Sequence, residues 1–401
     1  MVALDGIRSL DELELEGQRV FIRVDFNVPL DDAGKITDDE RIVRTLPTIK
    51  FAVDAGARVI LASHLGRPKG KPTPEFSLEP CGARLSELTG YDVMLPDDCL
   101  GDAARKVIAD LRKNQVVLLE NLRFHAEEEK DDETFARALA DLCDVYVNDA
   151  FGAAHRAHAS VHALPLLKRE RGMGFLLKEE LTSLRRITDA PERPFVAVLG
   201  GAKVADKIGV IESLFDKCDV LAIGGAMANT LLAAQGVDLK GSKIEKDKLA
   251  LSRTLLDKAR SRGVEVLLPV DVVAATSLDA TEGRATEATL LRDGEMALDV
   301  GPKTAKLFGD RIATAKTVFW NGPMGLFENP AFSGGTFAVA QALADSAAFS
   351  VVGGGDSAAA IRAAGGDIAT KISFISTGGG ASLELLEGKK LPGVEALRVA
   401  K

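Results

Sequence analysis

Two groups of chemically capable residues occur along the 401-residue chain, one in each half. In the first half, His64, Arg67, Arg123 and Arg156 follow short apolar runs. Together with Arg41, they give this half four arginines and a histidine near one edge of the predicted sheet. An arginine fork can bind a carboxylate or a phosphate through two parallel hydrogen bonds. Several arginines at one place would therefore suit a ligand that carries both kinds of group.

The second half has glycine-rich segments after its apolar runs. They are residues 200–207 (GGAKVADK), 224–229 (GGAMAN), 321–325 (NGPMG), 353–357 (GGGDS) and 377–380 (TGGG). Glycine lets the backbone approach a phosphate or a base closely, and a helix that begins after a glycine offers free N–H groups to an anion. Lys203 and Lys207 add positive charge, and Asp356 could hold Mg²⁺ together with phosphates. These features predict a nucleotide site. No GxxxxGK[ST] motif occurs, and no GxGxxG with an acidic residue about 20 positions on, so a dinucleotide site is not indicated.

These segments need a scaffold, and the apolar runs supply one. The runs are apolar on both faces, which is typical of central strands in a parallel sheet. The predicted strands are 19–24, 58–62, 116–119, 145–147, 195–199, 220–223, 264–268, 317–320, 349–352 and 372–375. Helical segments alternate with them, including 40–55, 77–89, 131–142, 206–216, 246–262 and 335–346. Strand–helix alternation predicts an α/β fold with parallel sheets, in which ligands bind beyond the carboxyl ends of the strands.

The chain length suits two or three domains. The best break lies at 168–174, followed by a helix-like stretch at 175–188 that Asp189-Ala-Pro-Glu-Arg-Pro194 interrupts. We therefore predict two doubly wound, Rossmann-like domains joined by a hinge helix. The predicted ranges are 1–171 for the first domain, 172–188 for the hinge helix and 189–391 for the second domain.

Composition excludes several classes of protein. The formal net charge is −9 and the pI about 5.3, so a basic footprint for nucleic acid or anionic lipid is absent. No apolar run reaches the ~18 residues of a membrane span, and the acidic N-terminal stretch does not read as a signal peptide. We expect a cytoplasmic protein. Its four cysteines, Cys81, Cys99, Cys143 and Cys218, form no CxxC pair and are expected to be buried apolar residues.

The histidines do not predict a metal centre or a hydrolase triad. His155, His158 and His162 are close in sequence, but no HExxH motif occurs and Arg156 would repel a cation. No GxSxG elbow is present to support a serine nucleophile.

Eight segments resemble phosphoglycerate kinases, and the resemblance covers the whole chain. They are VDFNVP (24–29), SHLGRP (63–68), ENLRF (120–124), NDAFGAAHRAHAS (148–160), LGGAKVADKI (199–208), FWNGPMGLFE (319–328), GGGDSAAA (353–360) and STGGGASLE (376–384). The resemblance implies reversible transfer of a phosphoryl group from 1,3-bisphosphoglycerate to MgADP, giving 3-phosphoglycerate and MgATP. It also implies direct transfer without a phosphoenzyme, a monomer, and residues 392–401 packing back on the first domain.

The resemblance assigns site residues to both halves. It implies phosphoglycerate binding by Asp25, Asn27, Arg41, His64, Leu65, Gly66, Arg67, Arg123 and Arg156. It implies nucleotide binding by Gly200, Gly201, Lys203, Lys207, Gly224, Gly225, Ala297, Asn321, Gly325, Glu328, Gly354, Gly355, Asp356 and Ser357, with Asp356 on the metal. Arg41, Lys207, Gly355 and Gly380 fall in catalytic positions. One departure is visible, because many relatives have Met-Gly-Leu where this chain has Met296-Ala297-Leu298.

This chemistry agrees with the residue inventory. An acyl phosphate is a reactive donor, so no protein nucleophile is needed, and the phosphoryl group in transfer needs fixed positive partners. Water must be excluded, and two half-sites that meet on domain closure would exclude it. Two other functions are compatible with these features. One is that of a different small-molecule kinase on a doubly wound fold, and the other is that of a two-domain binding protein without catalysis, similar to periplasmic binding proteins.

Overall fold

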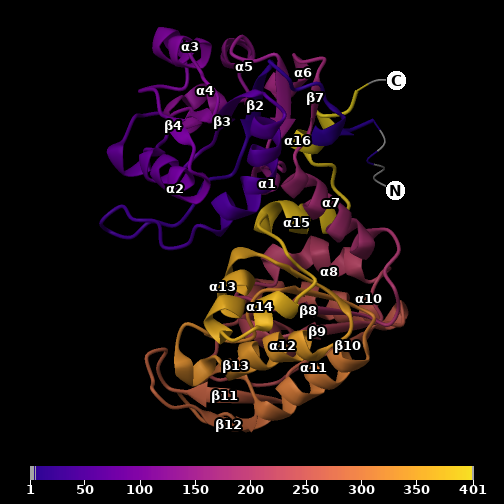
Figure 1. The fold of residues 1–401 in the computed structure, drawn as a ribbon. Coiled ribbons are helices and arrows are strands. Elements are labelled where there is room, and N and C mark those ends of the chain that lie inside the picture. Colours follow the sequence, from indigo (N-terminus) through magenta and orange to yellow (C-terminus); the bar gives the residue numbers. More distant parts are fainter. Residues whose placement is uncertain (1–3, 5, 400–401) are drawn as a thin grey trace. The chain divides into compact units, whose positions relative to one another are not determined.

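The computed structural model describes residue 4 and residues 6–399, and they form two compact units. Unit 1 comprises Met1–Thr182 and Lys390–Lys401, and unit 2 comprises Ser183–Lys389. Figure 1 shows unit 1 in indigo and magenta, with a yellow segment from the end of the chain, and unit 2 in rose to yellow. The division between the units falls inside one helix, α7 (Phe175–Thr188).

Unit 1 is built on a seven-stranded sheet. In spatial order its strands are β1 (Arg8–Ser9), β7 (Arg171–Met173), β6 (Val145–Asn148), β2 (Arg19–Arg23), β3 (Arg58–Ala62), β5 (Gln115–Leu118) and β4 (Asp92–Met94). All neighbours in this order are parallel. The helices of this unit are α1 (Glu40–Asp54), α2 (Glu79–Thr89), α3 (Gly101–Ala109), α4 (Ala126–Glu129), α5 (Glu133–Ala140), α6 (Ala163–Leu166) and α16 (Pro392–Glu395).

Unit 2 has a six-stranded parallel sheet with the order β10 (Glu265–Leu267), β9 (Val220–Ile223), β8 (Phe195–Leu199), β14 (Thr317–Asn321), β15 (Phe349–Gly353) and β16 (Phe374–Ile375). A three-stranded antiparallel sheet accompanies it, with β11 (Asp271–Ala275) between β12 (Arg284–Glu287) and β13 (Met296–Val300). The helices are α8 (Ile208–Leu214), α9 (Gly225–Ala234), α10 (Leu249–Ser261), α11 (Pro302–Thr314), α12 (Gly334–Asp345), α13 (Gly355–Ala364), α14 (Ile368–Lys371) and α15 (Gly379–Leu386).

Short 3₁₀ turns carry several polar residues between these elements. They are η1 (Leu10–Glu12), η2 (Pro74–Phe76), η3 (Leu122–Phe124), η4 (Phe151–Ala153), η5 (Ala205–Lys207), η6 (Lys246–Lys248), η7 (Ala288–Leu290) and η8 (Pro330–Phe332).

Burial of the apolar strands explains why these residues form parallel sheets. All five residues of β8 and all five of β14 are buried, as expected for strands covered on both faces. The largest fully buried side chain is Trp320 on β14, and its indole Nε1 donates a 2.8 Å hydrogen bond to Gly322 O. The core of unit 2 thereby fixes the start of a glycine turn.

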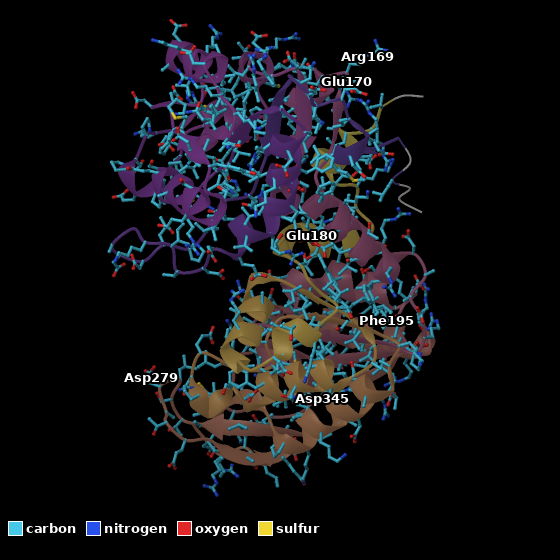
Figure 2. All side chains as sticks on the ribbon, in the orientation of Figure 1. Arg169, Glu170, Glu180, Phe195, Asp279 and Asp345 are labelled. Carbon is cyan, nitrogen blue, oxygen red and sulfur yellow. The ribbon has the colours of Figure 1, made fainter. Side chains whose placement is uncertain are left out.

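The end of the chain completes unit 1. Gly393 N donates to Ala154 O at 2.9 Å, and Asn148 Nδ2 donates to Gly393 O at 3.1 Å. Val399 N donates to Gly6 O at 2.8 Å, close to the N-terminal strand. Beside it, β1 is tied to the strand region of β7 by an ion pair of 2.8 Å between Arg8 and Glu170, which is labelled in Figure 2.

The fold class is confirmed, since two parallel α/β sheets alternate with helices as expected. The structure adds elements that the sequence analysis does not predict. The stretch 168–174, predicted as the best break, contains β7, which is paired on both sides with β1 and β6. The antiparallel sheet of β11, β12 and β13 is not predicted, because none of its strands is buried along its whole length and two of them, β12 and β13, are mostly part-buried or exposed.

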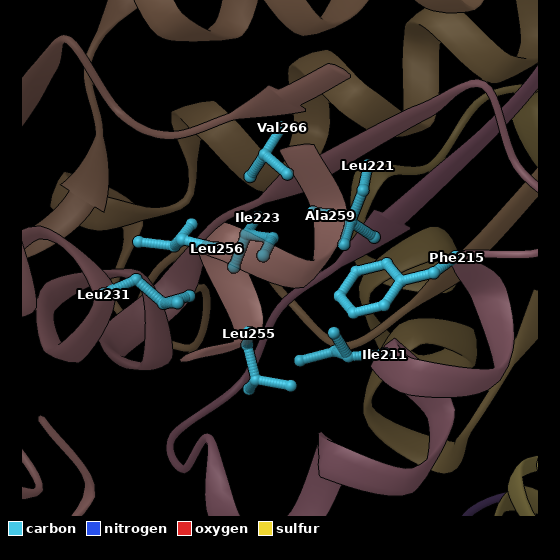
Figure 3. A pocket seen from close by; sticks show the side chains of 9 residues that line it. All are labelled: Ile211, Phe215, Leu221, Ile223, Leu231, Leu255, Leu256, Ala259 and Val266. Atoms are coloured by element: carbon cyan, nitrogen blue, oxygen red, sulfur yellow. The ribbon is translucent and has the colours of Figure 1, made fainter. Parts of the chain in front are cut away.

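An apolar hollow lies in unit 2 among α8, α9, α10 and strands β9 and β10 (Figure 3). Its lining includes Phe215, Leu255 and Ala259. Its volume of ≈ 10 Å³ is about that of one water-sized sphere. This hollow is too small for a substrate.

Candidate active site

In unit 1, the first loop at the carboxyl end of the sheet holds an ion pair. Asp25 follows β2, and its Oδ2 lies 2.7 Å from Nη1 of Arg41 on α1. Burial of Asp25 opposes ionisation and is the largest single effect, but Arg41, His64, Arg23 and the hydrogen bond from Asn27 N together outweigh it and lower the pKa of Asp25 to about 2. The carboxylate is therefore ionised throughout the neutral range.

His64 lies beside this pair in its neutral form. Burial and the surrounding arginines hold the pKa of His64 well below its usual value. Its Nδ1 is 3.1 Å from an Nη of Arg23 and 3.9 Å from Oδ1 of Asp25. Because the ring is neutral, its nitrogen accepts from Arg23 and the contact with Asp25 is not an ion pair.

Hydrogen bonds between side chains and the backbone join the loops after β2, β3 and β5. Asn27 Oδ1 accepts a 2.9 Å hydrogen bond from Gly66 N, and Gly66 O accepts one of the same length from Nη1 of Arg123. Arg123 sits on η3, which begins with the side chain of Asn121 accepting from Arg123 N at 3.0 Å. Leu65 contributes its carbonyl to Asn121 Nδ2. The loops after β2, β3 and β5 thus form one connected surface.

Three arginines concentrate positive charge there. Burial together with Arg123, Arg23 and Arg156 lowers the pKa of His158 to about 3. Burial also lowers the pKa of Arg123, and the charges of Arg23 and Arg156 lower it further, against an opposing effect of Glu129. Arg67, next to Gly66, is exposed. A group of like charges at one place is the arrangement that an anionic ligand neutralises.

Arg23 is a site-supporting residue that the sequence analysis missed. Its Nε donates to Ser160 Oγ at 2.9 Å, and Ser160 Oγ donates to Glu128 at 2.5 Å. It was counted within a predicted strand. The signal in the sequence is the second arginine of RVFIR (19–23). A charge at the end of a buried strand needs a partner, and this need could have pointed to Arg23.

In unit 2, hydrogen bonds between glycine turns hold the ends of three strands together. Gly200 N donates to Asn321 O at 2.9 Å, and Gly201 N donates to Pro323 O at 3.0 Å. Gly225 N, at the start of α9 and one residue after Gly224, donates to Met324 O at 2.9 Å. A Cβ at Gly200 would lie 2.1 Å from Pro323 O, so only glycine fits.

The start of α13 lies close to the start of α15. A Cβ at Gly379 would be 3.3 Å from the Cα of Gly354, which has φ +96°. Gly355 and Gly380 therefore lie in the first turns of two neighbouring helices, α13 and α15. The N–H groups of a first helical turn have no partner within the helix. Ser357 Oγ accepts from Gly322 N at 2.6 Å and fixes α13 to the turn after β14.

Asn321 is the last residue of β14, directly before this turn. Its Nδ2 donates to Gly353 O at 2.6 Å, while its buried Oδ1 has no hydrogen-bond partner among the described residues. A buried amide oxygen without a partner is unfavourable, and a donor on a ligand or a bound water would satisfy it.

The two lysines differ in environment. Lys203 is exposed, whereas Lys207 on η5 is part-buried. Burial lowers the pKa of Lys207 to about 8, and the carboxylates of Asp206 and Asp356 offset only part of that effect. The charge of Asp356 therefore acts on Lys207, and both belong to the phosphate end of the predicted site.

The predicted adenine end is formed by β13 and the turn after β14. Leu326 N donates to Leu298 O at 2.9 Å, and Ala297 N donates to Ser242 Oγ at 2.9 Å. A Cβ at Gly325 would lie 2.3 Å from Oδ1 of Asp299, so this turn also requires glycine. Glu328 is exposed beyond that turn.

The donor set in unit 2 fits Mg²⁺ bound to a nucleotide. Mg²⁺ is commonly held by one or two carboxylates, with phosphate oxygens and waters as the other ligands. Asp356 supplies an exposed carboxylate at the start of α13, and Asn321 supplies the unpartnered oxygen.

No helix in the described part of the chain is long and apolar enough to cross a membrane.

Taken together, the fold and these two residue sets define a phosphotransferase class: an α/β protein with an anion-binding unit and a glycine–lysine nucleotide unit. Comparison with known proteins gives the family. A family model described as phosphoglycerate kinase matches residues 10–389. The chain belongs to the phosphoglycerate kinase family.

Named relatives and solved structures agree. The chain is 56% identical to a phosphoglycerate kinase of Anaeromyxobacter sp. (strain Fw109-5) over 98% of this chain and 99% of the relative. It is 52% identical to a cytosolic phosphoglycerate kinase of Triticum aestivum, over 99% of each. The structure of phosphoglycerate kinase from Coxiella burnetii matches with a TM-score of 0.86 and 42% identity, over 98% of both chains. The crystal structure of phosphoglycerate kinase from Pyrococcus horikoshii OT3 matches with a TM-score of 0.85 and 34% identity, over 97% of this chain and 98% of the other.

The chain is thus a kinase with a carboxyl group as acceptor, and it interconverts 1,3-bisphosphoglycerate plus ADP with 3-phosphoglycerate plus ATP in glycolysis. This assignment excludes both alternatives, a non-catalytic binding protein and a different small-molecule kinase.

Proposed function

We propose that unit 1 binds the phosphoglycerate and unit 2 binds the nucleotide. The observation that supports this division is chemical: Arg23, Arg123 and Arg156 gather in unit 1, whereas the connected glycine turns with Lys203 and Lys207 lie in unit 2. The domain ranges predicted from sequence, 1–171 with 392–401 and 189–391, belong to this proposal.

In unit 1, the arginine forks take the phosphate and carboxylate groups of the substrate. Arg67, Arg123 and Arg156 supply the forks, and the exposed position of Arg67 makes it the residue most open to a ligand. The ionised carboxylate of Asp25 accepts from the hydroxyl of the substrate, and Asn27 with Gly66 holds the adjoining loop in place.

In unit 2, the turns at Gly200–Gly201, Gly224–Gly225 and Gly325 receive the adenine and Glu328 the ribose. Lys203 and Lys207 contact the phosphates, with Gly354 and Ser357 at the phosphate end. Asp356 holds Mg²⁺, which supplies charge neutralisation on the nucleotide phosphates when bound.

Transfer is direct and in line. An oxygen of the ADP β-phosphate attacks the phosphorus of the acyl phosphate, the new P–O bond forms, and the bond to the carboxyl oxygen breaks. Arg41, Lys207 and the N–H groups at the starts of α13 and α15 (Gly355 and Gly380) stabilise the charge on the phosphoryl group. No side chain forms a covalent intermediate.

The reacting group must touch residues of both units, so we propose that the units close about the hinge helix when both substrates are bound. Each substrate alone contacts one unit and should favour closure only weakly. Solution scattering with no ligand, each ligand alone and both checks this. A radius of gyration that is unchanged in the ternary complex would contradict the proposal.

The remaining features of the proposal concern the setting of the enzyme. It works as a monomer in the cytoplasm, with small-molecule substrates and no nucleic-acid partner; the cytosolic phosphoglycerate kinase of Triticum aestivum supports the location.

The division between units is tested by binding. Arg67→Ala should weaken 3-phosphoglycerate binding and leave ADP binding unchanged, and Lys203→Ala should do the reverse, because both side chains are exposed and neither supports the core. Calorimetry measures both ligands on both variants. The in-line step is tested with a chiral phosphorus label: inversion is expected, and retention would indicate a phosphoenzyme.

A further inference from the structure

Three residues outside the catalytic inventory bring metal-binding atoms together in unit 1. Asp98 and Cys99 lie in the loop between β4 and α3, and His125 lies between η3 and α4. The carboxylate oxygen, the thiol sulfur and an imidazole nitrogen of these residues all lie within 4.8 Å of one another. The two segments are far apart in sequence, so the fold and not local spacing creates the group.

Asp98 is the hub of the cluster. Its Oδ1 lies 2.7 Å from Nε2 of His125 and accepts from Cys99 N at 2.6 Å, and the thiol sulfur of Cys99 lies within 4.8 Å of the ligand atoms of Asp98 and His125. A divalent cation could bind among the carboxylate oxygen, the imidazole nitrogen and the sulfur, with the thiol proton released on binding.

The surroundings favour positive charge. The carboxylates of Asp98 and Glu128 lie close enough to Cys99 to act on its thiol electrostatically. The same negative charges would attract a cation, and a bound metal removes the thiol proton outright. The group differs from the arginine-rich surface described above, where cations are repelled.

The shape suits a site with one open position. Cys99 is buried, while the side chains of Asp98 and His125 keep 49% and 29% of their exposure. The ring of Phe135 packs at 5.2 Å from the imidazole and limits its movement. An ion can thus enter from the Asp98 side while the sulfur stays sheltered from solvent.

We propose that Asp98, Cys99 and His125 form a binding site for a thiophilic divalent cation of the Zn²⁺ type, separate from the Mg²⁺ site of unit 2. Tetrahedral Zn²⁺ with ligands at ~2.0–2.3 Å keeps its ligand atoms roughly 3.3–3.6 Å apart. The three atoms lie within 4.8 Å of one another, and the Asp98–His125 contact of 2.7 Å must lengthen by roughly 0.6 Å. Water fills the fourth position. Mg²⁺ does not compete, because it prefers oxygen ligands in an octahedral arrangement.

The site has a structural consequence. His125 directly follows η3, which carries Arg123, so a bound ion ties the loop at residues 97–100 to the base of an anion-binding arginine. Binding to the folded state alone raises stability by RT ln(1 + [L]/Kd), about 2.7 kcal/mol at a hundredfold excess over Kd.

The test uses the full chain without nucleotide and with excess Mg²⁺. Zn²⁺ is titrated against a chromophoric chelator, and Co²⁺ is added separately to look for a thiolate-to-cobalt charge-transfer band. We expect one Zn²⁺ per chain, a sulfur band with Co²⁺, release of protons on binding, and a higher melting temperature with Zn²⁺.

Variants assign the ligands. Cys99→Ser should abolish the cobalt sulfur band and weaken Zn²⁺ binding at least tenfold, while Mg²⁺-dependent kinase activity is kept. Asp98→Asn and His125→Gln alter part-exposed side chains, so they report on binding even if Cys99→Ser does not fold.

Two matched controls are available within the same unit. Cys143→Ser changes another buried thiol, and His162→Gln breaks another histidine–carboxylate pair, with Asp131 at 2.6 Å, that has no cysteine beside it. Both controls should bind Zn²⁺ as the parent does. Absence of stoichiometric Zn²⁺ binding in the parent, or binding that survives both Cys99→Ser and His125→Gln, would overturn the proposal.

Discussion

The part-buried Lys207 makes the binding of MgADP depend on pH in a way that can be calculated. Burial places the pKa of Lys207 at about 8 in the free protein, and only the protonated form offers a charge to the phosphates. A bound phosphate raises that pKa, so the complex keeps its proton to higher pH. The protonated fraction of a group with a pKa of about 8 falls about tenfold between about pH 7 and about pH 9. The apparent Kd for MgADP should therefore rise about tenfold over this interval, or ~1.4 kcal/mol.

Isothermal titration calorimetry over this interval measures the effect, and two variants identify the residue. Lys207→Arg keeps its charge at every pH in the interval, so its affinity should be almost constant from about pH 7 to about pH 9, whatever its absolute value. Lys203→Arg changes the exposed neighbour and should retain the tenfold change. The reasoning is refuted if the parent shows no change, or if Lys207→Arg shows the same change as the parent.

Three further predictions concern the other parts of the molecule. Arg41→Ala should lower kcat by ~10²–10³ with a smaller change in KM, because its charge is used most in the transition state; a raised KM with near-normal kcat in steady-state assays would assign it to substrate binding instead. Asp356→Ala should weaken binding of MgADP much more than that of 3-phosphoglycerate, and equal losses by calorimetry would point to damage to the start of α13. Leu255→Ala, which enlarges the apolar hollow in Figure 3, should destabilise unit 2 by about 2–5 kcal/mol in urea unfolding followed by the fluorescence of the single tryptophan, Trp320, whereas Leu256→Ala, which lines the same hollow from a part-exposed position, should cost less.

The sequence could predict the parallel sheets because burial on both faces leaves a direct mark on the residues. Strands such as β3 and β8 have the predicted bounds, since each is a run of five residues that ends at a polar residue or a glycine. The strand β7 escaped prediction because Arg171-Gly-Met173 is short and contains glycine. Its place in the sheet comes from pairing with β6, which no local pattern reveals.

The candidate site was partly visible for a similar reason. Residues that follow strands, such as Asp25 and Asn321, could be located by position alone. Their environments could not, because burial and partners depend on the whole fold. The 2.7 Å ion pair of Arg41 with Asp25 and the buried Asn321 oxygen without a partner are properties of packing. The same holds for Arg23, whose partner Ser160 lies 137 residues away.

The return of the last residues to unit 1 has a consequence for synthesis of the chain. Unit 2 is one continuous segment, Ser183–Lys389, and it is synthesised before Lys390. Unit 1 lacks its bonds from Gly393 to Ala154 and Asn148 until Gly393 has been made and has left the ribosome. During synthesis the unit that is begun first is therefore the unit that is completed last.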